Sequence, residues 1–237
     1  MTLVIGLKCS NGIVIGADRM GVKFRATAIK SYWSKVFTSN FGDGRAIIYG
    51  LAGAKQDALR ALREIDPGRF SLREKASLEE YLENIVEPRE ARLYLRLRET
   101  RGREPEYSLT IGCINPDGSP TLATVYNDGS FDLESISTMG VGAPFAELIL
   151  RDIDVERLDI DTAANLIGVI IAKVSLVHAE VNGITYGMDI LKVYGETPND
   201  VIRLSNEELS KILNLAQRVS FSDIPDKLRK AIEEGSK

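Results

Sequence analysis

Residues 1–19 read MTLVIGLKCSNGIVIGADR, and two apolar runs in this stretch flank a tight turn. The first run covers residues 3–9 and the second covers residues 13–17, with Ser10, Asn11 and Gly12 between them. Asn-Gly readily adopts the positive φ angles of a two-residue turn, so the pattern predicts an antiparallel hairpin. The second strand leads directly into Asp18 and Arg19.

After this hairpin, strands and helices are expected in separate blocks. The expected strands are residues 35–39, 45–51, 107–115, 121–126, 131–138, 186–194 and 201–204. The expected helices are residues 54–65, 77–100, 144–151, 162–181, 206–218 and 223–234. Segregated blocks favour an α+β fold over a parallel α/β sheet. We expect one domain over residues 1–237, in which residues 205–237 form a C-terminal helical extension.

Proline and capping residues indicate where several of these helices begin or break. Pro88 is expected to kink or divide the helix of residues 77–100, because proline lacks the N–H that the helix needs. Asp161 is predicted to cap the helix of residues 162–181. Ser205 and Glu208 have the spacing of a capping box at the start of residues 206–218.

The composition is that of an ordinary globular protein, with 44% apolar and 27% charged residues. A formal net charge of −4 provides no basic surface for nucleic acid or an anionic membrane, so neither partner is expected. The short apolar run of residues 3–7 ends at Lys8, before it could serve as a signal core. The later apolar run of residues 166–181 is interrupted by polar side chains and is predicted to be too short to span a bilayer.

Cys9 and Cys113 both fall in expected strands. Buried free thiols are the simplest interpretation of both residues, and they favour a reducing, cytoplasmic location.

Thr2 lies directly behind Met1. Removal of Met1 would leave a threonine with a hydroxyl nucleophile and a free α-amine, whose unperturbed pKa is about 8. The amine can then accept the hydroxyl proton within the same residue, as in hydrolases with an N-terminal threonine. Many chains begin with Met-Thr, so the prediction depends on the residues that follow.

Several short blocks occur in the order and spacing of one family. They are TLVIG at residues 2–6, GIVIGADR at 12–19, KVF at 35–37, LAG at 51–53 with DA at 57–58, and GVGAPFA at 140–146. Over roughly residues 2–195 the chain resembles the proteasome β-subunit family of N-terminal-nucleophile hydrolases. The resemblance implies a four-layer αββα sandwich, in which two sheets lie between layers of helices.

The resemblance also assigns catalytic roles. It implies that Thr2 is the nucleophile and that Asp18, at the family's separation of sixteen residues, stabilises the charge of a neighbouring lysine. Lys35 matches that lysine one residue later than ungapped counting predicts, which a short loop insertion would explain, and Lys30 is the competing assignment. A cation beside the hydroxyl would lower the hydroxyl's pKa and assist proton transfer.

Gly53 matches the family glycine whose backbone N–H stabilises the oxyanion, and Gly50 is the second candidate. Leu51 would then line the pocket for the substrate residue that precedes the cut, which would favour an apolar side chain.

Two departures from the family pattern are visible. Val141 stands where the family has a serine that helps to orient the terminal amine. The family's later aspartate and serine cannot be aligned, and the candidates are Glu180, Asn182 and Thr185. His178 is the single histidine of the chain, which argues against a zinc site, so no metal or cofactor is expected.

The resemblance implies a threonine-type endopeptidase that cleaves peptides or unfolded proteins through an acyl-enzyme on Thr2. It also implies a homo-oligomeric ring and leaves room for an ATPase or activator as partner. One alternative is a peptide ligase similar to the connectases, which passes the acyl group to an amine. The other is a catalytically inactive ring or scaffold subunit.

Overall fold

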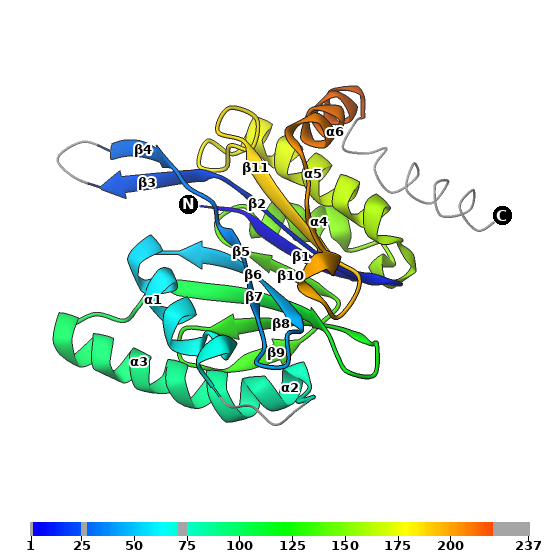
Figure 1. The fold of residues 1–237 in the computed structure, drawn as a ribbon. Coiled ribbons are helices and arrows are strands. Elements are labelled where there is room, and N and C mark those ends of the chain that lie inside the picture. The colour runs from blue at the N-terminus through cyan, green and yellow to red at the C-terminus, as the bar shows by residue number, and fades with distance from the viewer. Residues whose placement is uncertain (1, 25–27, 71–74, 220–237) are drawn as a thin grey trace.

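Two five-stranded antiparallel sheets form the centre of the protein (Figure 1). The computed structural model describes residues 2–24, 28–70 and 75–219, without the side chains of residues 22–30. The first sheet has the order β10 (Ile136–Met139), β1 (Val4–Cys9), β2 (Gly12–Asp18), β11 (Met188–Val193) and β12 (Val201–Arg203). The second has the order β5 (Val36–Asn40), β6 (Ala46–Gly53), β7 (Tyr107–Ile114), β8 (Pro120–Tyr126) and β9 (Phe131–Leu133). The predicted α+β class with antiparallel sheets is therefore confirmed.

Helices pack against the outer side of each sheet (Figure 1). The first sheet is covered by α4 (Ala143–Leu150) and α5 (Ile160–Val177), with α6 (Asn206–Arg218) packed on α5. The second sheet is covered by α1 (Lys55–Ile65), α2 (Leu78–Tyr81) and α3 (Glu87–Arg101), and the π-helical segment Leu82–Val86 joins α2 to α3. Short 3-10 turns lie at Pro67–Arg69, Val155–Arg157 and Pro198–Asp200.

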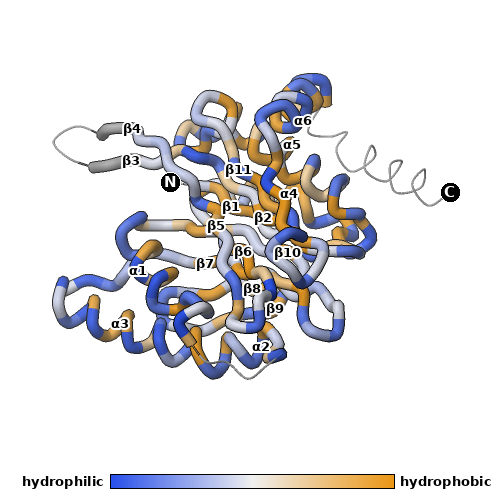
Figure 2. The backbone as a smooth tube through the Cα atoms, in the orientation of Figure 1, coloured by the Kyte–Doolittle hydropathy of each residue, from blue (hydrophilic) through white to orange (hydrophobic). Residues whose placement is uncertain are grey.

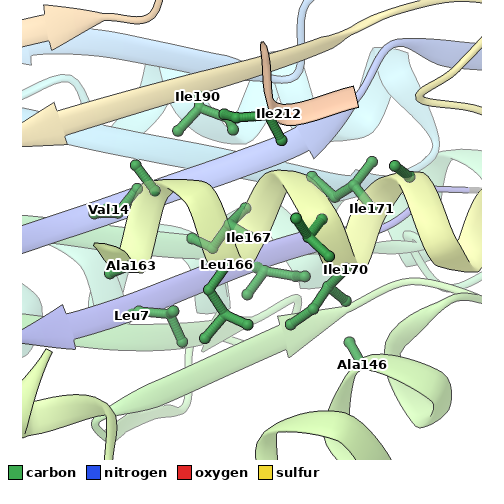
Figure 3. Close-up of a cluster of buried hydrophobic side chains, with 14 of the residues drawn as sticks. Leu7, Val14, Ala146, Ala163, Leu166, Ile167, Ile170, Ile171, Ile190 and Ile212 are labelled. Carbon is green, nitrogen blue, oxygen red and sulfur yellow. The ribbon is translucent and has the colours of Figure 1, made fainter. Parts of the chain in front are cut away.

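The buried apolar side chains form three clusters. Figure 3 shows Ile167 and Ile170 of α5 packed over the first sheet, near Leu7 and Val14. A second group of side chains fills the space between the two sheets, and a third lies between the second sheet and its helices. In Figure 2 the central strands carry hydrophobic colours, whereas α3 alternates between hydrophilic and hydrophobic residues along its length.

The helix α5 is, among the described residues, the one helix long and apolar enough to cross a membrane by length and composition. The helix begins six residues before the apolar run of residues 166–181 on which the sequence-based expectation rested. However, 67% of the helix is buried inside the protein, where it packs between α6 and the first sheet. Burial of this kind is common for the core helix of a globular domain.

The thiols of Cys9 and Cys113 are free and buried, as predicted. Burial raises the pKa of each thiol to about 12, which leaves both in the protonated, unreactive form near neutrality.

The sequence analysis missed one hairpin, and one of its strand predictions was wrong. The loop insertion expected before Lys35 contains a hairpin of β3 (Met20–Phe24) and β4 (Ala28–Tyr32), which extends away from the two sheets in Figure 1. The single strand expected over residues 131–138 is divided, because β9 pairs with β8 whereas β10 pairs with β1. Glu134 and Ser135 therefore carry the chain from one sheet to the other.

The helix predictions differ from the structure at several ends, since α5 begins at Ile160 and stops at Val177, and one predicted cap is wrong. Asp159, not Asp161, caps α5, since its side chain accepts hydrogen bonds from the backbone N–H groups of Asp161 and Thr162. Pro88 lies in the first turn of α3, where a missing N–H is harmless, and the π-helical segment precedes it. The capping box of α6 is confirmed. The predicted helix of residues 223–234 lies outside the described residues.

Candidate active site

The register of the β1–β2 hairpin brings Thr2 to Asp18. Val4 pairs with Ala17, and beyond this pair the backbone N–H of Asp18 donates to the Leu3 carbonyl over 3.2 Å. The Leu3 N–H returns a hydrogen bond of 2.8 Å to Asp18 Oδ1. The Thr2 hydroxyl donates to the same oxygen over 3.2 Å, so the candidate nucleophile is held at the open end of the hairpin, opposite its turn.

Lys35 reaches the same carboxylate from the second sheet. Its Nζ lies 2.9 Å from Asp18 Oδ1, and both side chains are almost completely buried. The Lys35 carbonyl accepts a 2.8 Å hydrogen bond from the Leu51 N–H, which fixes the lysine backbone to β6. Burial lowers the pKa of Lys35 against the opposing effect of Asp18, which brings the amine closer to exchanging protons near neutrality. Lys30, the competing assignment, lies in β4, and its side chain is outside the described residues.

The Asp18 carboxylate is oriented through both of its oxygens. Oδ1 accepts from Thr2, Leu3 and Lys35, while Oδ2 accepts from the backbone N–H of Met20 over 3.0 Å. Four donors fix one rotamer of the side chain, so Asp18 joins the Thr2 hydroxyl, the Lys35 ammonium group and the backbone N–H groups of Leu3 and Met20.

A double-glycine turn holds the Thr2 backbone from the opposite side. Gly140 has φ of +90°, and a Cβ there would lie 2.4 Å from the Thr2 carbonyl oxygen and 2.7 Å from Thr2 Cγ2. The Gly142 N–H donates to the same carbonyl over 3.3 Å. Only glycine permits so close an approach at position 140. Val141, between these two residues, is 38% exposed.

Gly53 and Gly50 occupy different environments. Gly50 is buried between the sheets, where a Cβ would lie 2.5 Å from Val4 Cγ1. Gly53 ends β6 with φ of +99°, and a Cβ there would lie 2.1 Å from the Glu106 carbonyl oxygen. Strand β7 runs across the first sheet in a direction that two contacts define: Thr110 of β7 faces Gly6 of β1, and Gly112 faces Ile13, the β2 partner of Lys8. The start of β7 therefore lies toward the start of β1. Gly53 pairs with Tyr107 at the start of β7, so it lies on the side of Thr2.

The interpretation of Leu51 was wrong. Its side chain is completely buried in the cluster between the second sheet and the helices α1 and α3. Neighbouring residues of a strand point to opposite faces, so Ala52, not Leu51, faces the first sheet. Leu51 therefore does not line a substrate pocket.

Sequence reasoning missed an ion pair beside the site. Asp189 of β11 is almost completely buried and is bound by the guanidinium groups of Arg19 and Arg203, the latter at 2.7 Å. Burial raises the pKa of Asp189, but hydrogen bonds from Arg19 and Ser34 outweigh it and hold the pKa below its usual value. Arg19 follows Asp18 directly, so this pair ties the end of β2 to β11. Arg19 in the block GADR was the available signal, but nothing local pointed to its partner.

The segment after α5 contains the three unaligned candidates. Val181 lies against the glycine turn, since a Cβ on Gly142 would be 2.9 Å from Val181 Cγ2. Asn182 Oδ1 accepts a 2.7 Å hydrogen bond from the Thr185 N–H, so these two residues form a local turn. Within the described part of the chain, neither they nor Glu180 contribute a hydrogen bond to Thr2.

The single histidine packs against an aromatic ring of α4. The His178 ring contacts Phe145 edge-on, with ring centroids 5.7 Å apart. The described residues contain no group of three or more His, Cys, Asp or Glu side chains placed to hold a metal ion.

Comparison with known proteins gives a likeness in structure only. No protein-family model matches the chain, and no curated protein sequence matches it. Anbu from Yersinia bercovieri, described as an ancestral beta-subunit, is similar with a TM-score of 0.72 and 13% identity over 91% of this chain and 93% of that one. A Gly-1 mutant of Anbu from Hyphomicrobium sp. strain MC1 is similar with a TM-score of 0.70 and 14% identity over 100% of both chains.

These comparisons establish the fold. The chain folds like Anbu over nearly its whole length, which agrees with the fold expected from its resemblance to β-subunits. At this level of identity the likeness does not transfer an activity, so the function must be argued from the site itself.

Proposed function

We propose that this protein is an N-terminal threonine peptidase of proteasome type, which cleaves peptides or unfolded proteins after Met1 has been removed. The observation that carries the proposal is the convergence of Thr2, Asp18 and Lys35 on one oxygen atom, Asp18 Oδ1. A hydroxyl, a carboxylate and a buried amine with a lowered pKa form a suitable proton-transfer group.

The proposed reaction has two steps. The free α-amine of Thr2 accepts the hydroxyl proton while Oγ1 attacks the scissile carbonyl, and Lys35 stabilises the developing alkoxide. The Gly53 N–H stabilises the oxyanion, and the leaving amine departs with the transferred proton. Water then attacks the ester, which releases the acid product and restores the Thr2 hydroxyl.

The architecture is the second part of the proposal. The packing order of helices, sheet, sheet and helices supports a four-layer αββα sandwich of N-terminal-nucleophile hydrolase type.

Self-association into a ring is the third part, supported by an exposed apolar surface on α4 and the end of α5. Leu148 is 65% exposed and Leu176 is 66% exposed, and Phe145 and Val177 are exposed beside them in sequence. Exposed apolar patches of this kind commonly become buried in protein–protein contacts.

Val141 provides a specific reason to retain one alternative, an inactive ring or scaffold subunit. A serine hydroxyl at this position, between Gly140 and Gly142, would lie in the turn that contacts the Thr2 carbonyl. Valine cannot orient the terminal amine through a hydrogen bond.

The test uses the full chain and begins with its intact mass, which shows whether Met1 has been removed. A peptide epoxyketone that bonds to both the hydroxyl and the α-amine should then add one equivalent, mapped to Thr2 by peptide sequencing. Thr2→Ala should abolish labelling and reduce peptide turnover by about a thousand-fold or more, whereas Thr2→Ser should retain both.

The outcomes separate the three functions. Hydrolysed products support the peptidase, whereas products with a new junction between two supplied peptides indicate the connectase-like ligase. A correctly trimmed Thr2 that neither reacts with the epoxyketone nor turns over peptide would contradict the proposal and favour the scaffold subunit.

A further inference from the structure

A cavity of about 490 Å³ opens between the edge of the first sheet and strands β7 and β8. Its lining includes the hydroxyls of Ser108, Thr124 and Thr138 and the carboxyls of Glu134 and Glu147. Cavities of this size are typical of sites that bind a side chain or a small molecule.

This cavity adjoins the candidate nucleophile. Gly140 belongs to its wall and is also the residue that lies against the backbone and Cγ2 of Thr2. On the other sheet, Ser108 lines the cavity and pairs with Ala52, the residue before Gly53. The cavity therefore borders one residue that contacts the proposed nucleophile and one that lies beside the strand end of the proposed oxyanion donor.

The two carboxyls are held in place by hydroxyls. Glu147 accepts a 2.7 Å hydrogen bond from the Thr138 hydroxyl, and Glu134 accepts one from Thr124. Thr124 and Ser137 are themselves hydrogen-bonded over 2.5 Å, which links Glu134 to the buried part of β10. These contacts fix positions but supply no charge.

The cavity has an uncompensated negative charge. Within the described residues, neither Glu134 nor Glu147 forms an ion pair. Burial raises the pKa of Glu134 against the opposing hydrogen bonds from Thr124 and Ser137, and the negative charges of Asp132 and Glu147 add to the increase. A bound cation would relieve this repulsion, whereas a bound anion would increase it.

The spacing fits a peptide that extends from the reacting bond. Thr138 and Ser137 precede Gly140 by two and three residues of nearly extended chain, or about 7 to 10 Å at the rise of a strand. A bound peptide advances about 3.3 to 3.6 Å per residue, so its side chain would reach the carboxyls from a position one to three residues away from the cut.

We propose that this cavity is a specificity subsite for a lysine or arginine side chain of the peptide substrate, recognised by Glu134 and Glu147. The inference rests on the proposed peptidase function. Arginine can bond both oxygens of a carboxylate, and lysine can donate to both residues. The subsite selects peptides with a basic residue one to three positions from the cleaved bond.

The test uses the trimmed full chain and matched decapeptides that carry a single lysine, norleucine or glutamate at each position in turn. Cleavage is followed by mass spectrometry. At one position, kcat/KM should be about ten-fold higher or more for lysine than for norleucine. In the Glu134→Gln/Glu147→Gln variant this ratio should fall to within about three-fold, while cleavage of the norleucine peptide is maintained.

Controls separate the subsite from net charge and folding. Glu83→Gln/Glu207→Gln removes two exposed carboxyls that do not line the cavity and should preserve the lysine preference. Glu147 is exposed on α4, so Glu147→Gln alone provides a folded variant in which the preference should be reduced. A wild-type protein that cleaves all the peptides equally, or a preference that survives in the double variant, would overturn the subsite proposal and leave the peptidase proposal intact.

Binding decides the matter if no peptide is cleaved. Fluorescein-labelled lysine and norleucine peptides are titrated against Thr2→Ala, with and without the two glutamine substitutions, and followed by anisotropy. Tighter binding of the lysine peptide that depends on Glu134 and Glu147 supports the subsite even if the peptidase proposal fails. Equal binding of both peptides contradicts it.

Discussion

The Lys35 ammonium group lies 2.9 Å from the Asp18 carboxylate, and the two side chains are 1% and 0% exposed. The pair joins the two sheets, because Asp18 ends β2 of the first sheet while Lys35 immediately precedes β5 of the second. A charge pair so deeply buried is costly to desolvate, so its presence beside the Thr2 hydroxyl favours a chemical role over a stabilising one.

Removing one member of this pair should destabilise the protein. Asp18→Asn leaves the Lys35 amine without its counter-charge, and we expect the free energy of unfolding to fall by about 3 kcal/mol. Urea denaturation of Asp18→Asn, Lys35→Met and the double variant measures the effect. The double variant should regain part of the loss because no buried charge remains. Additive losses in the double variant would show that the two groups are not coupled.

Gly53→Ala should be costlier than an ordinary glycine substitution. The new Cβ would lie 2.1 Å from the Glu106 carbonyl oxygen, which belongs to the backbone and cannot move aside cheaply. Gly102→Ala is the matched control, since Gly102 also has positive φ but has nothing within 4 Å of the new Cβ. We expect about 1 kcal/mol of destabilisation at Gly102 and distinctly more at Gly53, with a loss of kcat at Gly53 only. If both variants show the same loss of thermal stability and the same turnover, Gly53 has no special role.

Much of the site could be predicted because one local pattern fixes it. The Asn11-Gly12 turn sets the hairpin register, and that register places Asp18 beside Leu3 and Thr2. The choice of Lys35 over Lys30 followed from the family resemblance, because Val36 and Phe37 continue the family pattern after it. In each case the relevant contact depends on a turn or a strand end that is visible within about twenty residues.

The rest depends on contacts that local sequence does not encode. Arg19 and Asp189 are 170 residues apart, and only the pairing of β2 with β11 brings them together. The division between β9 and β10 also escapes a pattern argument, because both strands have the extended conformation and differ only in the sheet they join. The face to which Leu51 points was misjudged because Gly50, Leu51 and Ala52 are all buried, so no alternation of polarity marks the strand.

Val141→Ser should increase turnover. The residue lies between two glycines that contact Thr2, and its partial exposure means that the substitution should leave the fold intact. A hydroxyl here could orient the α-amine, so we expect kcat to rise about ten-fold with little change in KM. Val141→Ala is the control for side-chain size. An equal rise in the alanine variant would indicate that valine obstructs the site and that the hydroxyl has no role.

Glu90 should make stability depend on pH. Its side chain is fully buried on α3, Oε2 accepts a hydrogen bond from Tyr107, and Oε1 has no hydrogen-bond partner among the described residues. Burial raises the pKa of Glu90 to about 7, although the Tyr107 hydrogen bond opposes the shift. An unfolded glutamate has a pKa of about 4.3, so the folded state favours the neutral acid. The stabilisation is complete below about pH 4 and is lost as the pH rises through 7.

Glu90→Gln should remove this dependence, because the amide stays neutral at every pH. Urea denaturation gives the free energy of unfolding of the variant minus that of wild type. This difference should increase by about 3 kcal/mol between pH 4 and pH 8. Glu87→Gln, an exposed position on the same helix, should leave the wild-type profile unchanged. Tyr107 pairs with Gly53 in the sheet, so ionisation of Glu90 should also perturb the proposed oxyanion donor. If Glu90→Gln has the same dependence of the free energy of unfolding on pH as wild type, the wild-type carboxylate finds a partner on ionisation and its burial carries no penalty.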